Sequence, residues 1–273
     1  MRELSLREIQ LSEFEILIEF DKICRENNLR YSLAAGTLLG AVRHKGFIPW
    51  DDDIDVMMPR PDYEKFRNIF HEKADTFKFD LTADRGEQAK YPFIKMINKS
   101  VEVHNIGFAE VNCVWIDIFP LDGFPADRKK SLKLIKKAQL YKHVILVSKY
   151  RNSKYYHGRH SKLKFLMGRA FAKLYGVRRA LKNSLKLAFK RSYNNSQYIG
   201  IIVWNCYGIG ERLLKSQYEN LTELMFEGNK FYCIECWDNY LHELYGDYMQ
   251  IPSEDKRKTH NIKALQEDNV DKH

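Results

Sequence analysis

The chain has 273 residues, of which 44% are hydrophobic and 30% are charged, a composition typical of folded rather than disordered proteins. No stretch approaches about 18 uninterrupted apolar residues, and the acidic residues near the N-terminus do not fit a signal peptide. We therefore expect a protein that neither spans a membrane nor is exported, with its five cysteines reduced in the cytoplasm.

The first part of the chain predicts helices and strands in alternation, from helical spacing of apolar residues and from apolar–polar alternation. The predicted elements are, in order, a helix over residues 5–27, a strand over 31–35, a helix over 37–44, a strand over 53–58 and a helix from Pro61. Thr37 stands where its side chain would cap the second helix. In the strand over 53–58, Asp53 and Asp55 project to one face and apolar residues to the other.

Further strands are predicted over residues 77–82, 91–98, 101–104 and 114–119. The last of these has the strongest strand pattern, rich in β-branched and aromatic residues, with Asp117 in its middle. A hairpin at Gly228 and a helix that ends at Gly246 are predicted next, and the last dozen residues are expected to be frayed. These elements predict an α/β (α+β) fold, a mixed sheet flanked by helices.

The basic residues are concentrated in one part of the chain. Residues 128–210 contain 21 Lys and Arg and not one Asp or Glu, whereas the remainder has 24 basic against 36 acidic residues. Helical spacing over 128–195 predicts basic helices with one apolar stripe, formed by Leu163, Leu166, Met167, Ala170, Phe171, Leu174, Leu181, Leu185, Ala188 and Phe189. This region favours an anionic membrane surface, or else a phosphate-rich polymer. A plain solvated helical pair is the alternative, and nucleic acid is the weakest prediction because no nucleic-acid-binding module is recognisable.

The acidic residues Asp53 and Asp55 form the strongest candidate site. Two unpaired carboxylates side by side repel one another, and a divalent cation such as Mg²⁺ resolves this repulsion. The upstream pair Gly36 and Thr37 opens a helix, whose first N–H groups can hold a phosphate. Asp117 supplies a third carboxylate to this site. The site would hold one or two Mg²⁺ ions, with Mn²⁺ as the alternative metal. The alternative interpretation is a solvated acidic turn.

Three basic residues are candidates for binding the phosphates of a donor. Arg43 and His44 lie just before the acidic strand, although a solvated helix end is an equal alternative. Lys95 lies within the apolar run of residues 93–97 and needs an anionic partner there. We therefore predict that Lys95 contacts a diphosphate, rather than extending its ammonium group to solvent.

Three segments of the sequence are similar to the LicD family. They are the run from Tyr31 to Glu64, with Ala-Gly-Thr-Leu-Leu-Gly-Ala-Val-Arg-His and Trp-Asp-Asp-Asp-Ile-Asp, the run Trp-Ile-Asp-Ile-Phe-Pro-Leu-Asp-Gly from Trp115, and Leu-Tyr-Gly-Asp-Tyr-Met-Gln-Ile-Pro from Leu244. The family resembles the nucleotidyltransferase fold of polymerase β, and it includes bacterial phosphocholine transferases and relatives of fukutin-related protein. The resemblance implies that Gly36 and Thr37 form a phosphate-side turn, that Asp53 and Asp55 bind metal, and that Asp117 is the third carboxylate.

The resemblance also implies a reaction, the transfer of phosphocholine from CDP-choline to a sugar hydroxyl of a teichoic acid or lipopolysaccharide precursor. The acceptor would be a glycan or a lipid-linked teichoic acid precursor. Aromatic side chains would hold the quaternary ammonium; the candidates are Trp50, Trp204, Tyr207, Trp237, Tyr240 and Tyr245. Another CDP-alcohol such as CDP-ribitol, nucleotidyl transfer, and a non-enzymatic polyanion- or membrane-binding protein are the alternatives. We predict a catalytic core over 1–127, a basic helical region over 128–197 and a C-terminal α/β segment over 198–273, at the inner face of the plasma membrane or free in the cytoplasm.

Overall fold

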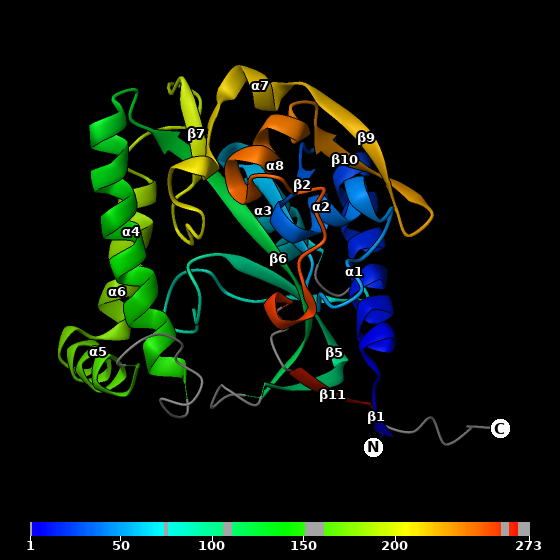
Figure 1. The fold of residues 1–273 in the computed structure, drawn as a ribbon, viewed down its shortest axis with the longest axis horizontal. Helices are drawn as coiled ribbons and strands as arrows, with labels where there is room; N and C mark the ends of the chain where they lie inside the picture. The colour runs from blue at the N-terminus through cyan, green and yellow to red at the C-terminus, as the bar shows by residue number, and fades with distance from the viewer. Residues whose placement is uncertain (1, 74–75, 106–110, 151–160, 258–261, 267–273) are drawn as a thin grey trace.

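A computed structural model describes residues 2–73, 76–105, 111–150, 161–257 and 262–266 (Figure 1). The helices are α1 (Leu6–Glu26), α2 (Ala35–Arg43), α3 (Arg60–Glu72), α4 (Arg128–Lys149), α5 (Ser161–Tyr175), α6 (Val177–Ala188), α7 (Lys215–Glu219) and α8 (Trp237–Tyr245), with the 3-10 helices η3 (Gly208–Glu211) and η4 (Glu254–Lys256). The strands are β1 (Arg2–Glu3), β2 (Ser32–Leu33), β3 (Asp55–Pro59), β4 (Asp80–Leu81), β5 (Ile94–Asn105), β6 (Val111–Phe124), β7 (Tyr198–Ile201), β8 (Arg212–Leu214), β9 (Leu221–Phe226), β10 (Asn229–Ile234) and β11 (Ile262–Gln266). In these residues no helix is long and apolar enough to cross a bilayer.

A mixed sheet in the order β1-β11-β5-β6-β3-β2 forms the centre of the fold, which confirms the predicted fold class. The long strand β6 pairs with β5, β3 and β7 along different parts of its length. Its pairing with β3 is parallel, whereas the other strand pairs in the described residues are antiparallel. Figure 1 shows β6 crossing the middle of the molecule, with α1 on one side and α4, α5 and α6 on the other.

Several predicted elements are confirmed at nearly the expected bounds. Helix α1 begins after Ser5, whose side chain forms a capping box with Glu8. The predicted hairpin is β9–β10, and it turns through Glu227 and Gly228, both at positive φ. Helix α8 ends at Gly246, also at positive φ, as glycine permits.

The structure corrects the predictions around the first turn and the acidic segment. Thr37 does not cap α2, which begins two residues earlier with Ala34 as its N-cap. The Thr37 hydroxyl instead accepts a hydrogen bond of 2.8 Å from the backbone N–H of Asp55. The acidic strand is shorter than predicted, since β3 begins at Asp55 and leaves Asp53 in the irregular segment before it. Apolar–polar alternation correctly predicted a strand here, but the pairing of β3 with its neighbours determines where the strand begins.

Other predictions failed because contacts distant in sequence override local pattern. The two strands predicted over 91–98 and 101–104 are parts of one strand, β5, with an irregularity in its pairing to β6 after Asn98. Residues 262–266, expected to be frayed, form β11, which pairs with both β5 and β1. The remainder of that predicted tail lies outside the described residues.

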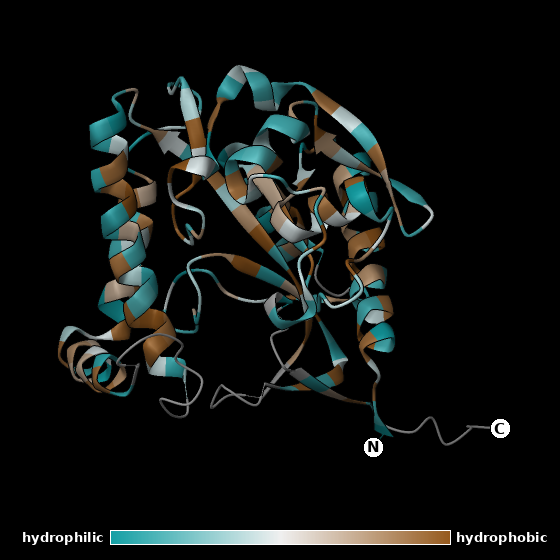
Figure 2. Ribbon diagram, viewed as in Figure 1, coloured by the Kyte–Doolittle hydropathy of each residue, from teal (hydrophilic) through white to brown (hydrophobic). Residues whose placement is uncertain are grey.

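The basic region has an apolar core of its own, and its apolar residues do not form one buried stripe. Helices α4, α5 and α6 pack around a separate buried cluster, formed by Val144, Ile145, Val147, Phe165, Ala172, Ala180 and Leu181. Gly176, at a φ of 90°, separates α5 from α6 and rotates their faces relative to each other. Seven members of the predicted stripe are exposed: Leu163, Leu166, Met167, Ala170, Phe171, Leu174 and Phe189. Figure 2 shows hydrophobic and hydrophilic residues interleaved along α4 and α5.

Candidate active site

Asp55 and Asp117 lie next to each other at the start of the parallel pairing between β3 and β6. They are register partners, and the N–H of Asp117 donates to the carbonyl of Ile54 at 2.8 Å. Because neighbouring strands are about 5 Å apart, side chains at paired positions lie on the same face of the sheet. The sheet therefore brings together two carboxylates that are 62 positions apart in the sequence.

The start of α2 lies against this pair, since the N–H of Ala34, its N-cap, donates to the carbonyl of Asp55 at 2.9 Å. Ala35 has a φ of 43°, which is uncommon for a residue with a side chain. The next residue is Gly36, where a Cβ atom would lie 2.7 Å from Asp51 Oδ2. Glycine therefore leaves room for a carboxylate at the start of the helix, the end that attracts negative groups.

Lys95 is the register partner of Asp117 on the other side of β6. Its Nζ lies 2.7 Å from Asp117 Oδ1, in an ion pair whose side chains are 12% and 13% exposed. The ammonium also lies 4.2 Å from the centre of the Trp115 ring. Lys95 therefore meets an anion in the protein, and its contact with a donor diphosphate stays a prediction.

Glu13, on the face of α1 that packs against the core, is a carboxylate that the motifs did not indicate. Its side chain is fully buried, and neither of its oxygens has a hydrogen-bond partner within the described part of the chain. Burial raises the pKa of Glu13 well above its ordinary value, and the charges of Asp53, Asp52, Asp51 and Asp117 raise it further. The raised pKa of Glu13 thus indicates that negative charge is concentrated around the acidic segment.

Glu13→Gln should raise the stability of the metal-free protein at neutral and alkaline pH. Between the ordinary pKa of 4.5 and the raised folded-state pKa, the folded protein binds one more proton than the unfolded chain. The stability of the wild type therefore falls as pH rises through that window, by up to about 1.4 kcal/mol per pH unit. Glutamine does not titrate, so the variant escapes this loss.

Urea unfolding in EDTA at about pH 5 and about pH 8 measures this difference, which should grow with pH. Glu15→Gln is the matched control, because that side chain on the same helix is 57% exposed. Equal pH dependence in Glu13→Gln and the wild type would show that Glu13 is not held protonated by its surroundings.

Arg43 and His44 lie at the end of α2, where Arg43 contacts the C-terminal segment and His44 contacts Trp50. Arg43 donates to the backbone carbonyl of Tyr248, at 2.6 Å. Burial lowers the pKa of His44, and the Arg43 charge lowers it further. The imidazole lies edge-on to Trp50, whose ring is also covered by the Arg257 guanidinium at 4.5 Å. Phosphate binding by Arg43 and His44 stays a prediction.

Tyr207, in the loop of residues 204–211, contacts Tyr245 at the end of α8. The hydroxyls of Tyr207 and Tyr245 are 2.8 Å apart, and burial raises the pKa of both groups, with the Asp55 charge adding to the effect. Glu211 anchors the loop by accepting from the N–H groups of Cys206 and Tyr207, and burial raises its pKa to about 7. An aromatic surface therefore stands beside the carboxylates.

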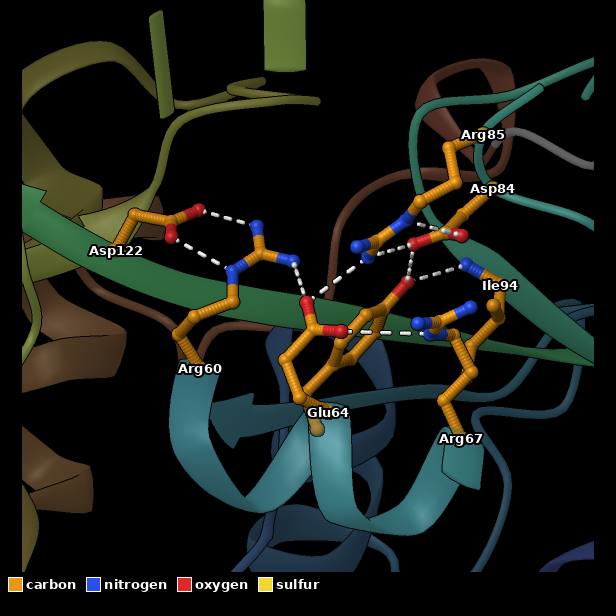
Figure 3. A network of polar contacts seen from close by, with 8 residues as sticks. Arg60, Glu64, Arg67, Asp84, Arg85, Ile94 and Asp122 are labelled. Carbon is orange, nitrogen blue, oxygen red and sulfur yellow. Dashed lines mark hydrogen bonds and ion pairs between the residues drawn. The ribbon is translucent and has the colours of Figure 1, made fainter. Parts of the chain in front are cut away.

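A network of charged residues supports the strands that carry Lys95 and Asp117 (Figure 3). Arg60, at the start of α3, donates to both carboxylate oxygens of Asp122 on β6, at 2.8 and 2.6 Å. Tyr63, on the same helix, donates to Asp84 and accepts from the N–H of Ile94, the residue before Lys95. Helix α3 thus fixes both strands from one side.

The residues around Asp55 and Asp117 suit a divalent cation by their chemistry. Among the described residues, no three His, Cys, Asp or Glu side chains are arranged as a ready metal-binding group. Carboxylate oxygens are nevertheless the ligands that Mg²⁺ prefers, and both buried oxygens of Glu13 have no hydrogen-bond partner within the described chain. The accumulated negative charge favours a bound cation.

Comparison with known proteins identifies the family. The model of the LicD/FKTN/FKRP nucleotidyltransferase domain matches residues 28–146. Over 266 residues the chain is 32% identical to the lipopolysaccharide cholinephosphotransferase LicD of Haemophilus influenzae, a match that covers 96% of this chain and 98% of that protein. This chain belongs to the LicD family. Shorter matches link it to uncharacterised proteins of Rickettsia typhi, 41% identical over 59 residues, and Rickettsia prowazekii, 46% identical over 46 residues; they cover 22% and 17% of this chain and 19% and 17% of those proteins.

The residues matched by the LicD domain include every catalytic, metal-binding and donor-binding candidate named from the sequence: Gly36, Thr37, Arg43, His44, Asp53, Asp55, Lys95 and Asp117. Glu13 and Tyr207 lie outside the matched range, and sequence reasoning assigned Glu13 no role. A signal for Glu13 was present, because it is four residues from Ile9 and four from Leu17 on the apolar face of a helix. A carboxylate in such a position either lowers the stability of the fold or has a function.

Proposed function

We propose that this LicD-family chain transfers phosphocholine from CDP-choline to a hydroxyl of a teichoic acid or lipopolysaccharide precursor and releases CMP. The observation that carries this proposal is the match, over 96% of the chain, to a protein named lipopolysaccharide cholinephosphotransferase. The pairing of Asp55 with Asp117 supports it, since phosphoryl transfer needs carboxylates that position and neutralise charge.

In the proposed reaction the acceptor hydroxyl oxygen attacks the phosphorus that bears choline. A new O–P bond forms, the P–O bond to CMP breaks, and its electron pair leaves with CMP. Asp117 takes the proton of the acceptor hydroxyl. Asp53, Asp55 and Asp117 would hold Mg²⁺, which when bound would neutralise charge on the diphosphate.

Lys95 and the Ala35–Thr37 turn would orient the donor. The ammonium of Lys95 is already 2.7 Å from Asp117, so a diphosphate next to that carboxylate would come within its reach. The Thr37 hydroxyl holds the backbone of Asp55, and this contact fixes the start of β3 relative to α2. The helix start at Gly36 already lies against the Asp51 carboxylate, so a negatively charged group fits there, as a phosphate oxygen of the donor would.

Tyr207 and Tyr245 are the strongest candidates for the choline group among the six aromatic residues considered. Both lie within electrostatic range of Asp55. Tyr240, by contrast, is fully buried in the core, and the ring of Trp50 already carries Arg257. Quaternary ammonium groups bind to aromatic faces, and a carboxylate nearby adds attraction.

A panel of donors tests the proposed function. Purified protein with Mg²⁺ and a lipopolysaccharide or teichoic acid acceptor should release CMP from CDP-choline faster than from CDP-ribitol or CDP-glycerol. It should release no pyrophosphate from CTP. Preference for another CDP-alcohol would show that the proposed donor is wrong but the proposed site is right. Pyrophosphate release would identify the enzyme as a nucleotidyltransferase.

A further inference from the structure

Helix α5 is unusual in having apolar residues on two opposite faces. Its inner face packs on α4 through Phe165 and Ala172, each 4% exposed. Gly168, between them, lets the helices approach closely, since a Cβ atom there would lie 3.1 Å from His143 Nε2. Within the described residues, packing therefore accounts for one face of α5 only.

The outer face of α5 carries a second apolar stripe that points away from this contact. Its members recur every three or four residues, which places them on one side of the helix: Leu163, Leu166, Met167, Ala170, Phe171 and Leu174. Met167 is 65% exposed and Leu174 is 86% exposed. Figure 1 shows α5 beside the lower ends of α4 and α6, at the edge of the molecule.

The flanks of the outer stripe are basic. Lys164 lies on one side of it and Lys162, Arg169 and Lys173 lie on the other, all of them exposed. No acidic residue occurs anywhere between residues 128 and 210. An exposed apolar stripe bordered by cations is the pattern of helices that lie in the interface of an anionic membrane, with the apolar face buried about 5–10 Å.

We propose that α5 docks this protein on an anionic lipid surface through its outer stripe. The charge and the exposed apolar side chains of α5 argue against two other partners, a second copy of the chain and a soluble polyanion. A second copy would bring two rows of like charges together, which costs affinity. A soluble polyanion would bind the lysines without needing exposed leucine and methionine side chains. A lipid leaflet satisfies both features, because its headgroups pair with the cations and its acyl region takes the stripe.

Co-sedimentation of the full chain with vesicles tests this docking surface. The wild type should bind vesicles of phosphatidylcholine mixed with phosphatidylglycerol, bind phosphatidylcholine vesicles weakly, and dissociate in part at high salt. The variant Leu166→Ser/Met167→Ser/Leu174→Ser should lose at least about 10-fold in partitioning, because apolar transfer drives insertion. Lys162→Gln/Lys164→Gln/Lys173→Gln should bind equally weakly to both vesicle types.

The matched control is Leu11→Ser/Ile18→Ser, which removes apolar residues 44% and 43% exposed on α1 and should bind as the wild type does. Turnover of a soluble donor and thermal stability should not change in the α5 variants, so failure of docking is distinct from failure of the proposed transferase. Absence of wild-type binding at low salt, or equal binding by the serine variant, would overturn the proposal. A wild-type dimer that the serine variant dissolves would assign the stripe to self-association instead.

Discussion

Asp55→Asn is expected to reduce phosphocholine transfer at least about 100-fold, since even residues that only orient a metal ligand contribute 10- to 100-fold. Asp55 combines the two features that the site requires: it begins β3 and it is paired in register with Asp117. The substitution changes only one side-chain oxygen, and the backbone N–H of residue 55 keeps its acceptor, the Thr37 hydroxyl. The loss should therefore fall on kcat rather than on folding.

Thermal unfolding in EDTA separates this effect from misfolding. Removing one negative charge from the acidic cluster relieves repulsion, so the metal-free Asn variant should unfold at the same temperature as the wild type or higher. Addition of Mg²⁺ should stabilise the wild type more than the variant, because a ligand that binds the folded state stabilises it. Near-normal turnover in a folded Asp55→Asn variant would exclude Asp55 from the reaction.

Asp122→Asn is expected to lower the free energy of unfolding by about 3–5 kcal/mol, because it leaves a buried guanidinium without its charged partner. Arg60 is 8% exposed and Asp122 is 1% exposed, and the pair forms two hydrogen bonds. Glu64 remains near Arg60, at 3.3 Å, but its carboxylate is shared with Arg67 and Arg85. The loss should be visible in urea unfolding at neutral pH.

Glu15→Gln serves as the control for this measurement as well. Its ion pair with Lys78 is as short as the buried one, at 2.7 Å, but the two side chains are 57% and 64% exposed. Exposed pairs contribute less than about 1 kcal/mol. If Asp122→Asn cost no more than Glu15→Gln, the network in Figure 3 would not be what supports β6 against α3.

The sequence predicted most elements because their signals are local. The capping box at Ser5, the turn at Gly228 and the alternation around Asp117 each depend on a few neighbouring residues. The pairing of Asp55 with Asp117 depends instead on strand order: the residue types and the family resemblance both placed the two carboxylates in one site, but neither gave their register. The start of β3 and the inclusion of β11 also depend on partners far away in the chain.

Two further features of the molecule were not predicted, each for a different reason. Glu13 was assigned no role because helical spacing was counted on apolar residues, and a buried carboxylate does not add to that count. Which apolar residues of α5 are buried was not predicted, because periodicity identifies an apolar face without showing what covers it. With Phe165 and Ala172 also apolar, only the packing on α4 reveals which face is inside.

The most direct test of the central claim is to follow both products of one reaction. Purified protein, Mg²⁺, choline-labelled CDP-choline and a lipopolysaccharide or teichoic acid acceptor should yield CMP and label on the acceptor in equal amounts. Asp55→Asn should form neither product at a comparable rate. Incorporation of the nucleotide into the acceptor, or a folded wild-type protein that forms no CMP with any CDP-linked donor, would contradict the account.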